Sequence, residues 1–468
     1  MSQELCALTA SELVEAFRKR TLSPVDVTRA VLERIERFNP VFNAFILVAA
    51  DEAIEQAKAS EARWMSGQAK GLLDGVPVSI KDLILTKGWP TLRGSKTIDP
   101  KGPWKDDAPA TARLREHGAV IVGKTTTPEF GWKGVTDSPL TGITRNPWNK
   151  AKTPGGSSGG AAAAVAAGMA PLAVGTDGGG SIRIPCGFTG IFGIKPSFGR
   201  VPAWPLSPFG TVAHVGPMTR SVADAALMLN VLALPDARDW HALPHDPRDW
   251  RMALDQGIAD LRIAYSPNLG YAKVDPEVAA IVKDAVRVFQ DLGAKVEEKN
   301  PGFEDPAPIF MAHWFSGAAF LLKTLPNEKQ KLLDPGLVAM AEQGAKVTAH
   351  EVLEAQLKRG LLGTHMNLFH RDYDLLVTPT LSIAAFDAGK EVADEMLQSR
   401  WTDWTPFSFP FNLTQQPAAS IPCGLTKAGL PVGLHLVGPR YADALVLRAA
   451  QAFEKASGGS FSRPRTPG

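Results

Sequence analysis

Residues 153–196 read TPGGSSGGAAAAVAAGMAPLAVGTDGGGSIRIPCGFTGIFGIKP, and this stretch determines most of what the chain can build. A turn around Ser157 and Ser158, both able to cap a helix, leads into the alanine run 161–167, a strong helix former that Gly168 closes. A short apolar run, 172–174, then predicts a strand that leads into a second glycine turn. A turn, a helix, a strand and another turn in direct succession indicate an α/β unit.

The second turn carries three consecutive glycines, Gly178, Gly179 and Gly180, followed by Ser181. Residues without a Cβ can point successive backbone N–H groups at one spot and form a nest that binds an anion. A serine at the end of such a nest is placed to act as a nucleophile whose oxyanion those N–H groups stabilise. A solvent-facing glycine turn is the simpler interpretation of any single G-G-S, but two such turns joined by a helix and a strand favour catalysis.

Further short apolar runs, mostly with helical stretches between them, predict a large sheet and an α/β fold class. These runs are 76–80, 119–122, 172–174, 261–265, 375–377, 419–422 and 432–437. The first 70 residues are predicted to be helical, with Ser23 as a cap and Pro24 in the first turn. The polar stretches 235–260 and 301–402 are interpreted as peripheral loops or insertions, the second mostly helical.

The overall composition excludes several classes of protein. Of 468 residues, 44% are hydrophobic and 21% charged, which excludes wholesale disorder. The formal net charge is only +2, so no nucleic-acid partner is expected. Three widely spaced cysteines, Cys6, Cys186 and Cys423, form no C-x-x-C pair, which fits a reducing compartment and argues against structural zinc.

The sequence also predicts neither export nor a membrane span. Glutamates at positions 4, 12 and 15 interrupt the region where a signal peptide needs an apolar core, so a cytoplasmic location is expected. The longest weakly polar run, 159–175, consists mostly of alanine and glycine and is broken by Pro171, so it is unlike a transmembrane helix.

A nucleophilic Ser181 needs a base, and the nine histidines sit in no recognisable triad motif. Lys81 follows the apolar run 76–80, where a strand would carry it into the interior. A buried lysine is either neutral or paired with a carboxylate. Because Asp82 is adjacent, spacing alone leaves a neutral base and an ion pair as equal alternatives.

Two motif matches are rejected on their context. Gly155-x-Ser157-x-Gly159 fits the nucleophile elbow of α/β-hydrolases, but the preceding 145–150 is loop-like where the elbow needs a strand. Residues 118–125, GAVIVGKT, fit a phosphate-binding loop literally, but the residues that should form the loop are the apolar run of a strand.

Three separated blocks together resemble the amidase signature family of serine hydrolases. They are the run ending in Lys81, the PGGSSGG of 154–160 and the GTDGGGSIRIP of 175–185. GKTTTPEFGW from Gly123, RNPW from Arg145, PFNLTQQPAASIPCG and GLPVGLHLVG extend the resemblance over nearly the whole chain. It implies one large α/β domain over 1–468, with a single mixed sheet flanked by helices. Within it, 1–70 would be a helical N-terminal region, 71–235 the signature core, 301–402 a helical peripheral region and 403–468 a return to the core.

The resemblance also assigns roles, and it settles the contest over Lys81 in favour of a base. It implies that Ser181 is the acylated nucleophile and that Ser157, on a cis peptide, bridges it to Lys81. Backbone N–H groups of Gly178, Gly179, Gly180 and Ser181 would form the oxyanion hole. Supporting roles fall to Ser158, Asp177 and Arg183, and no metal or other cofactor is needed. Gly178 stands where a larger residue is more usual, which would loosen the loop slightly. Because Lys81 must be neutral, activity is expected to rise toward alkaline pH.

The substrate expected is a small carboxylic amide, cleaved to a carboxylate and ammonia or an amine. Aromatic walls would favour aryl or medium aliphatic acyl groups, although core or lid packing is an equal alternative for the same residues. The candidate wall residues are Phe130, Gly131, Trp132, Trp404 and Phe407, the last two in an aromatic run with Trp401, Phe409 and Phe411.

Other functions stay open beside the amidase. One is the glutaminase subunit of the tRNA-dependent amidotransferase, but Ile-Arg-Ile-Pro follows the nucleophile instead of that subunit's Ile-Arg-Gln-Pro, and its acidic residue is absent from 211–215. Hydrolysis of a urea-type amide, as in biuret or allophanate hydrolases, and a catalytically silent scaffold are further alternatives. A homodimer and a monomer are both compatible with the sequence.

Overall fold

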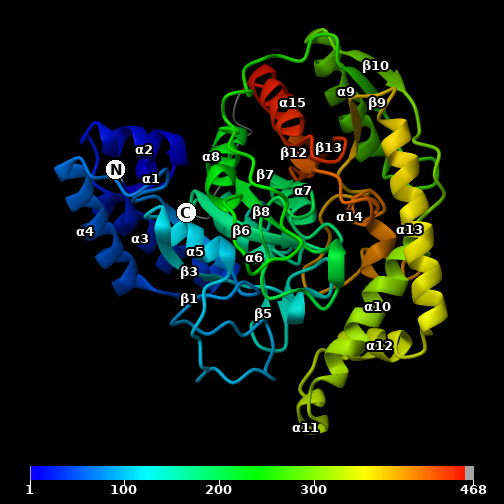
Figure 1. The fold of residues 1–468 in the computed structure, drawn as a ribbon, viewed down its shortest axis with the longest axis horizontal. Coiled ribbons are helices and arrows are strands. Elements are labelled where there is room, and N and C mark those ends of the chain that lie inside the picture. The colour runs from blue at the N-terminus through cyan, green and yellow to red at the C-terminus, as the bar shows by residue number, and fades with distance from the viewer. Residues whose placement is uncertain (1, 459–468) are drawn as a thin grey trace.

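The computed structural model describes residues 2–458, and a mixed eleven-stranded sheet runs through this part of the chain (Figure 1). The strands, in spatial order, are β1 (Phe45–Val48), β3 (Val120–Thr125), β2 (Pro77–Lys81), β6 (Leu172–Asp177), β8 (His214–Thr219), β7 (Phe192–Lys195), β12 (Ala418–Leu425), β13 (Pro431–Val437), β11 (Leu375–Pro379), β9 (Arg262–Tyr265) and β10 (Lys295–Glu298). β3, β2 and β6 are mutually parallel neighbours, whereas the strands from β6 through β8, β7, β12 and β13 to β11 pair antiparallel. The predicted α/β class with a single mixed sheet is confirmed.

Helices cover both faces of this sheet. The described helices are α1 (Ser2–Leu5), α2 (Ala10–Arg18), α3 (Pro24–Phe42), α4 (Ala50–Ser66), α5 (Pro109–Glu116), α6 (Gly159–Ala166), α7 (Arg183–Thr189), α8 (Val222–Leu232), α9 (Pro276–Asp291), α10 (Ala307–Lys323), α11 (Asn327–Gln330), α12 (Pro335–Gly344), α13 (Ala349–Phe369), α14 (Pro410–Leu413) and α15 (Asp443–Ala456). The helices α1–α4 gather on one side in Figure 1 and α10–α13 on the opposite side. Ser23 accepts hydrogen bonds from Val25 and Asp26 with Pro24 in the first turn, which confirms the predicted cap of α3.

Four strands were missed by the sequence patterns. The predicted helical region 1–70 also contains β1, and β7, β8 and β10 matched no predicted run. β7 and β8 carry glycine or proline, which weakens a strand pattern, and β10 is the mostly charged KVEE at the sheet edge. The small β4 (Asp137–Ser138) and β5 (Gly142–Ile143) pair separately from the main sheet.

The two faces of the sheet carry different clusters, and this division positions the site. Val78 and Ile80 of β2 pack into the large core cluster formed with α5, α8, α9 and α15. Because side chains alternate along a strand, Lys81 points to the other face. There α6 and α7 pack against Ala173 and Met218. Lys81 therefore faces the ends of the two glycine turns that begin these helices.

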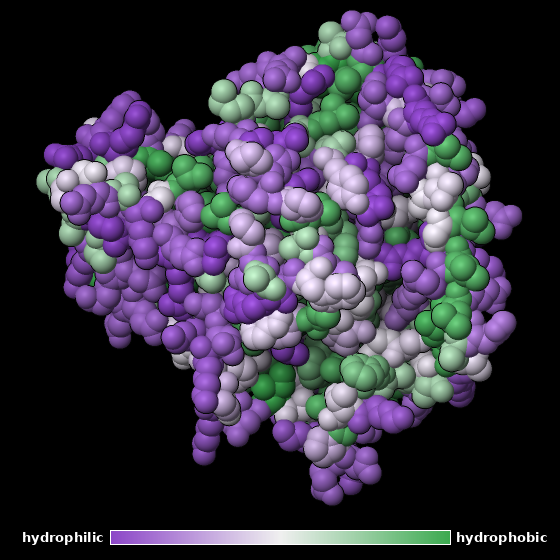
Figure 2. Space-filling view, in the orientation of Figure 1, coloured by the Kyte–Doolittle hydropathy of each residue, from purple (hydrophilic) through white to green (hydrophobic). Residues whose placement is uncertain are grey.

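The surface of the molecule carries no sign of a membrane crossing. Within residues 2–458, no helix combines the length and the apolar character that such a crossing requires. Figure 2 shows an apolar row over α13, where Leu353, Leu357 and Leu361 are exposed. The row follows the helical period of four residues, and the opposite face of α13 packs into the core through Leu362 and Met366.

Candidate active site

Lys81 ends β2 with its ammonium nitrogen among hydroxyl groups. The side chain is fully buried, and Nζ lies 2.7 Å from Ser157 Oγ, 2.9 Å from Ser158 Oγ and 2.9 Å from Thr176 Oγ1. The neighbouring Asp82 instead faces Lys124, at 3.6 Å between Oδ1 and Nζ. The ion-pair alternative between Lys81 and Asp82 is therefore wrong.

The surroundings of Lys81 favour its neutral form. Burial lowers the pKa of Lys81 well below its ordinary value, and the charge of Asp177 opposes this only in part. The second buried pair differs, because it has a carboxylate. Burial raises the pKa of Asp82 to about 6 against the opposing charge of Lys124, while burial lowers the pKa of Lys124 to about 8.

The first glycine turn brings two serines to Lys81. The peptide bond between Gly156 and Ser157 is cis. Ser158 is the residue before α6, but its side chain makes no capping hydrogen bond, so the predicted capping role is wrong. Its hydroxyl instead contacts Lys81, accepts a hydrogen bond from the Thr176 N–H at 3.3 Å and donates one to the Thr176 carbonyl at 3.1 Å.

The second glycine turn is built around a buried ion pair. Asp177, at the end of β6, accepts hydrogen bonds from Arg183 Nε at 2.9 Å and from Nη2 at 3.0 Å, and both side chains are fully buried. It also accepts the N–H of Gly180 at 2.8 Å and that of Ile182 at 3.2 Å. Burial alone would raise the pKa of Asp177, but the charge and hydrogen bonds of Arg183 outweigh it and hold the pKa well below the ordinary value.

This arrangement leaves fewer oxyanion donors than the sequence suggested. The Gly180 N–H is already committed to Asp177, so it is not free to bind a developing oxyanion. Within residues 2–458, the N–H groups of Gly178, Gly179 and Ser181 have no partner. Gly180 has a φ of +127°, and a Cβ there would lie 2.5 Å from Ser408 Oγ. Gly180 thus shapes the turn, and the other three residues present the donors.

Ser157 and Ser181 open onto one cavity of about 240 Å³. Ser181 retains only 6% of its exposure. No hydrogen bond joins the two serine hydroxyls in the part of the chain that the structure describes. Catalytic hydrogen bonds are often long without substrate and tighten when it binds.

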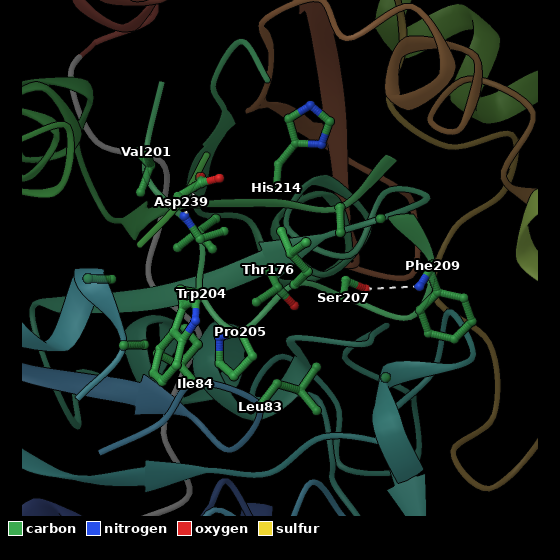
Figure 3. Close-up of a pocket in the computed structure, with 18 of the residues that line it drawn as sticks. Leu83, Ile84, Thr176, Val201, Trp204, Pro205, Ser207, Phe209, His214 and Asp239 are labelled. Atoms are coloured by element: carbon green, nitrogen blue, oxygen red, sulfur yellow. Dashed lines mark hydrogen bonds between the residues drawn. The ribbon is translucent and has the colours of Figure 1, made fainter. Parts of the chain in front are cut away.

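The cavity walls are mainly apolar and come from distant parts of the chain. Figure 3 shows Leu83, Ile84, Trp204, Pro205 and Phe209 around Thr176. The outer wall is a segment that the sequence patterns did not assign, 197–210, and the Ala203 N–H donates a 2.8 Å hydrogen bond to Asp239. Asp239 belongs to 235–260, so this stretch, expected to be peripheral, supports the cavity wall.

Trp314 of α10 forms a further wall, although 301–402 was expected to be peripheral. A Cβ on Gly178 would lie 2.8 Å from its indole ring, and Trp314 stacks on Phe209 with ring centroids 3.8 Å apart. The indole therefore occupies the space of the larger residue expected at position 178, which answers the expected loosening of the loop.

The predicted wall residues divide between cavity and core. Phe130 and Gly131 line the cavity, whereas Trp132, Trp404 and Phe407 are buried elsewhere. The Trp132 indole donates to Asp334 at 3.3 Å, Trp404 stacks on Phe188, and Phe407 packs with Leu269 and Met366. Those three are thus core residues. Sequence analysis missed Thr176, Trp204, Phe209 and Trp314; the aromatic and proline-rich AWPLSPF of 203–209 was the available signal for the outer wall.

Comparisons with known proteins agree with this site. The family model described as Amidase matches residues 26–447. An acylamidase of Rhodococcus erythropolis is 37% identical over 459 residues, covering 97% of this chain and 96% of the relative. A glutamyl-tRNA(Gln) amidotransferase subunit from Symbiobacterium thermophilum is 36% identical over 488 residues, covering 98% of both chains. The crystal structure of a bacterial aryl acylamidase belonging to the amidase signature enzymes superposes with a TM-score of 0.90 at 33% identity, covering 96% of both chains.

The family match extends over most of the chain, and the relatives align along nearly their whole length. The sheet, the two glycine turns and the buried lysine lie in the matched region. The chain belongs to the amidase signature family, whose members are hydrolases acting on C–N bonds.

Proposed function

We propose that this protein is an acylamidase, which hydrolyses a small carboxylic amide to a carboxylate and an amine or ammonia through an acyl-enzyme on Ser181. One observation carries the proposal: a buried lysine whose Nζ contacts three hydroxyl groups, while its neighbour Asp82 is engaged with Lys124. A lysine held neutral in this way can accept a proton from a serine.

The proposed proton path uses the contacts around Ser157. Neutral Lys81 takes the proton of Ser157, and Ser157 takes that of Ser181 as Oγ attacks the amide carbon. The resulting oxyanion is received by the free N–H groups of Gly178, Gly179 and Ser181, each contributing about 3 kcal/mol in comparable sites. Ser157 then protonates the departing nitrogen, which leaves as an amine because an amide anion is a poor leaving group. Water hydrolyses the acyl-enzyme by the reverse sequence.

The cavity walls support a substrate with an aromatic or medium aliphatic portion. Trp204, Phe209 and Trp314 give flat apolar surfaces beside Ser181, and such walls stack on aryl groups. The proposed location is the cytoplasm, because glutamates interrupt the N-terminal residues where a signal peptide needs an apolar core.

The second candidate is the glutaminase subunit of an amidotransferase, which relatives at 36% identity bear by name. Against it stands Ile184, which is fully buried where that subunit's pattern has glutamine. A Cβ on Gly180 would lie 2.8 Å from Ile184 Cδ1, so this apolar side chain packs directly on the nucleophile turn.

The test has two parts. A serine-directed fluorophosphonate should label the wild type and fail to label Ser181→Ala, and labelling of that variant would place the nucleophile elsewhere. The enzyme is then offered anilides, aliphatic amides, biuret and glutamine. Release of aniline by the chain alone supports the acylamidase. Ammonia from glutamine only with partner subunits, or from biuret only, would replace it by the corresponding alternative.

A further inference from the structure

Arg93 is a cation on the active-site wall with no partner for its charge. It lies in the loop after β2 and is the only lysine or arginine that lines the cavity within residues 2–458. Its backbone is fixed, because its N–H donates to the Asp82 carbonyl at 3.1 Å and its carbonyl accepts from the Phe130 N–H at 2.7 Å. Its guanidinium makes no hydrogen bond and no ion pair with any residue of the described chain.

An unpartnered guanidinium at this depth is unusual. The group carries five N–H donors, and their burial without acceptors costs free energy. Burial lowers the pKa of Arg93, and the carboxylate of Asp82 opposes this shift without a hydrogen bond to the guanidinium. None of the guanidinium nitrogens is sealed from solvent, so they remain available to a molecule that enters the cavity.

The position of Arg93 indicates which part of a substrate it would meet. It holds the N–H of Phe130, and the next residue, Gly131, packs against Ser157, where a Cβ would lie 3.2 Å from Ser157 Oγ. The oxyanion donors are bounded by another wall, where Trp314 packs on Gly178. In the proposed function Ser157 gives its proton to the leaving nitrogen. The wall that contains Arg93 therefore faces the amine portion.

We propose that Arg93 binds an anionic group, such as a carboxylate, on the amine portion of the substrate. This assignment rests on the proposed function for its orientation. A planar guanidinium matches a carboxylate through two parallel hydrogen bonds, and such charge-assisted pairs are stronger than neutral ones. The chain would then prefer N-acyl derivatives of amino acids or aminobenzoates over uncharged anilides.

The experiment compares 4-acetamidobenzoate with acetanilide, which differ only by a carboxylate on the amine side. Arg93→Gln should lower kcat/KM for 4-acetamidobenzoate by about 10- to 100-fold and leave that for acetanilide nearly unchanged. Arg93→Lys should retain part of the preference. The matched control is Lys96→Gln, which removes a charge from an exposed residue of the same loop and should change neither substrate.

Several outcomes would overturn the assignment. An equal loss on both amides would mean that Arg93 only supports the fold. A loss confined to N-phenylsuccinamate, which carries its carboxylate on the acyl side, would place the anion at the other end of the substrate. Binding of 4-aminobenzoate to the intact protein, measured by calorimetry, needs no turnover and should weaken in Arg93→Gln; equal affinities would also refute it. Failure of every amide to be hydrolysed, with this binding difference intact, would refute the proposed function alone.

Discussion

Lys81 Nζ lies 2.7 Å from Ser157 Oγ, although 76 positions separate the two residues. The contact exists because β2 ends where the first glycine turn crosses it, on the face of the sheet opposite the large core cluster. The second buried lysine nearby, Lys124, keeps Asp82 as its partner, together with the Ile84 carbonyl and the Thr91 hydroxyl, each at 2.7 Å. One strand end thus separates a lysine suited to proton transfer from a lysine that is paired structurally.

Replacement of Lys81 by methionine should remove the base and keep the volume. We expect kcat to fall by about 10³-fold or more, in line with general-base contributions of about 10² to 10⁴. Ser158→Ala, which removes one hydroxyl from the same nitrogen, should cost far less. Initial rates on an anilide measure both, with circular dichroism as the folding control. Equal losses in the two variants would contradict a special role for Lys81.

The pH dependence should report the neutral fraction of Lys81. The deprotonated form is the active one, so activity is lost as pH falls through its pKa and is constant above it. The sequence alone predicted a rise toward alkaline pH; burial lowers the pKa of Lys81 well below the ordinary 10.5, so the rise moves to lower pH. The rate of fluorophosphonate labelling against pH measures this without a substrate. A rate still climbing near pH 10 would show that Lys81 titrates as an ordinary lysine.

Gly178 and Trp314 should be energetically coupled. Gly178→Ala places a Cβ 2.8 Å from the indole, and overpacking of this kind costs about 1 to 3 kcal/mol. Trp314→Phe shortens the ring, so the double variant should recover much of the lost activity and thermal stability. A double-mutant cycle measures the coupling. Gly360→Ala, at an open position on α13, is the control for alanine itself. Additive effects of the two changes would contradict the contact.

The Asp177–Arg183 pair should dominate the stability of the nucleophile turn. Asp177→Asn leaves Arg183 buried without its counter-charge, which typically costs about 3 to 5 kcal/mol. The control is Asp387→Asn, which breaks the exposed 2.8 Å pair with Lys152 and should barely change the urea midpoint. Urea unfolding followed by fluorescence compares them. Similar midpoints for both variants would show that the buried pair adds nothing to stability.

The sequence predicted those parts of the molecule that depend on local pattern. The alanine helix, the strand before Asp177 and the lysine after an apolar run are all consequences of nearby residues. The cavity wall is different, since Phe130 and Trp132 are two positions apart and only the first lines it. Phe130 has a φ of +51° and Gly131 one of +73°, and this turn decides which ring enters the cavity.

Long-range contacts escape sequence patterns for a related reason. Trp314 fills the space beside Gly178 from 136 positions away, and nothing in its own helix indicates that target. The Gly180 N–H is indistinguishable in sequence from its neighbours, yet Asp177 has already engaged it. Donor availability depends on where a carboxylate lies in space.

The partners of Arg183 impose an order on the synthesis of an active molecule. Arg183 donates to the Ser408 carbonyl at 2.9 Å and to Asn412 Oδ1 at 2.7 Å, and Ser408 Oγ donates to the Gly179 carbonyl at 2.7 Å. Ser181 leaves the ribosome more than 220 residues before these groups exist. A growing chain therefore carries its nucleophile without the contacts that hold it in place, and a polypeptide that stopped before Ser408 would have the signature motif but an incomplete turn. Hydrolytic competence is acquired late in synthesis.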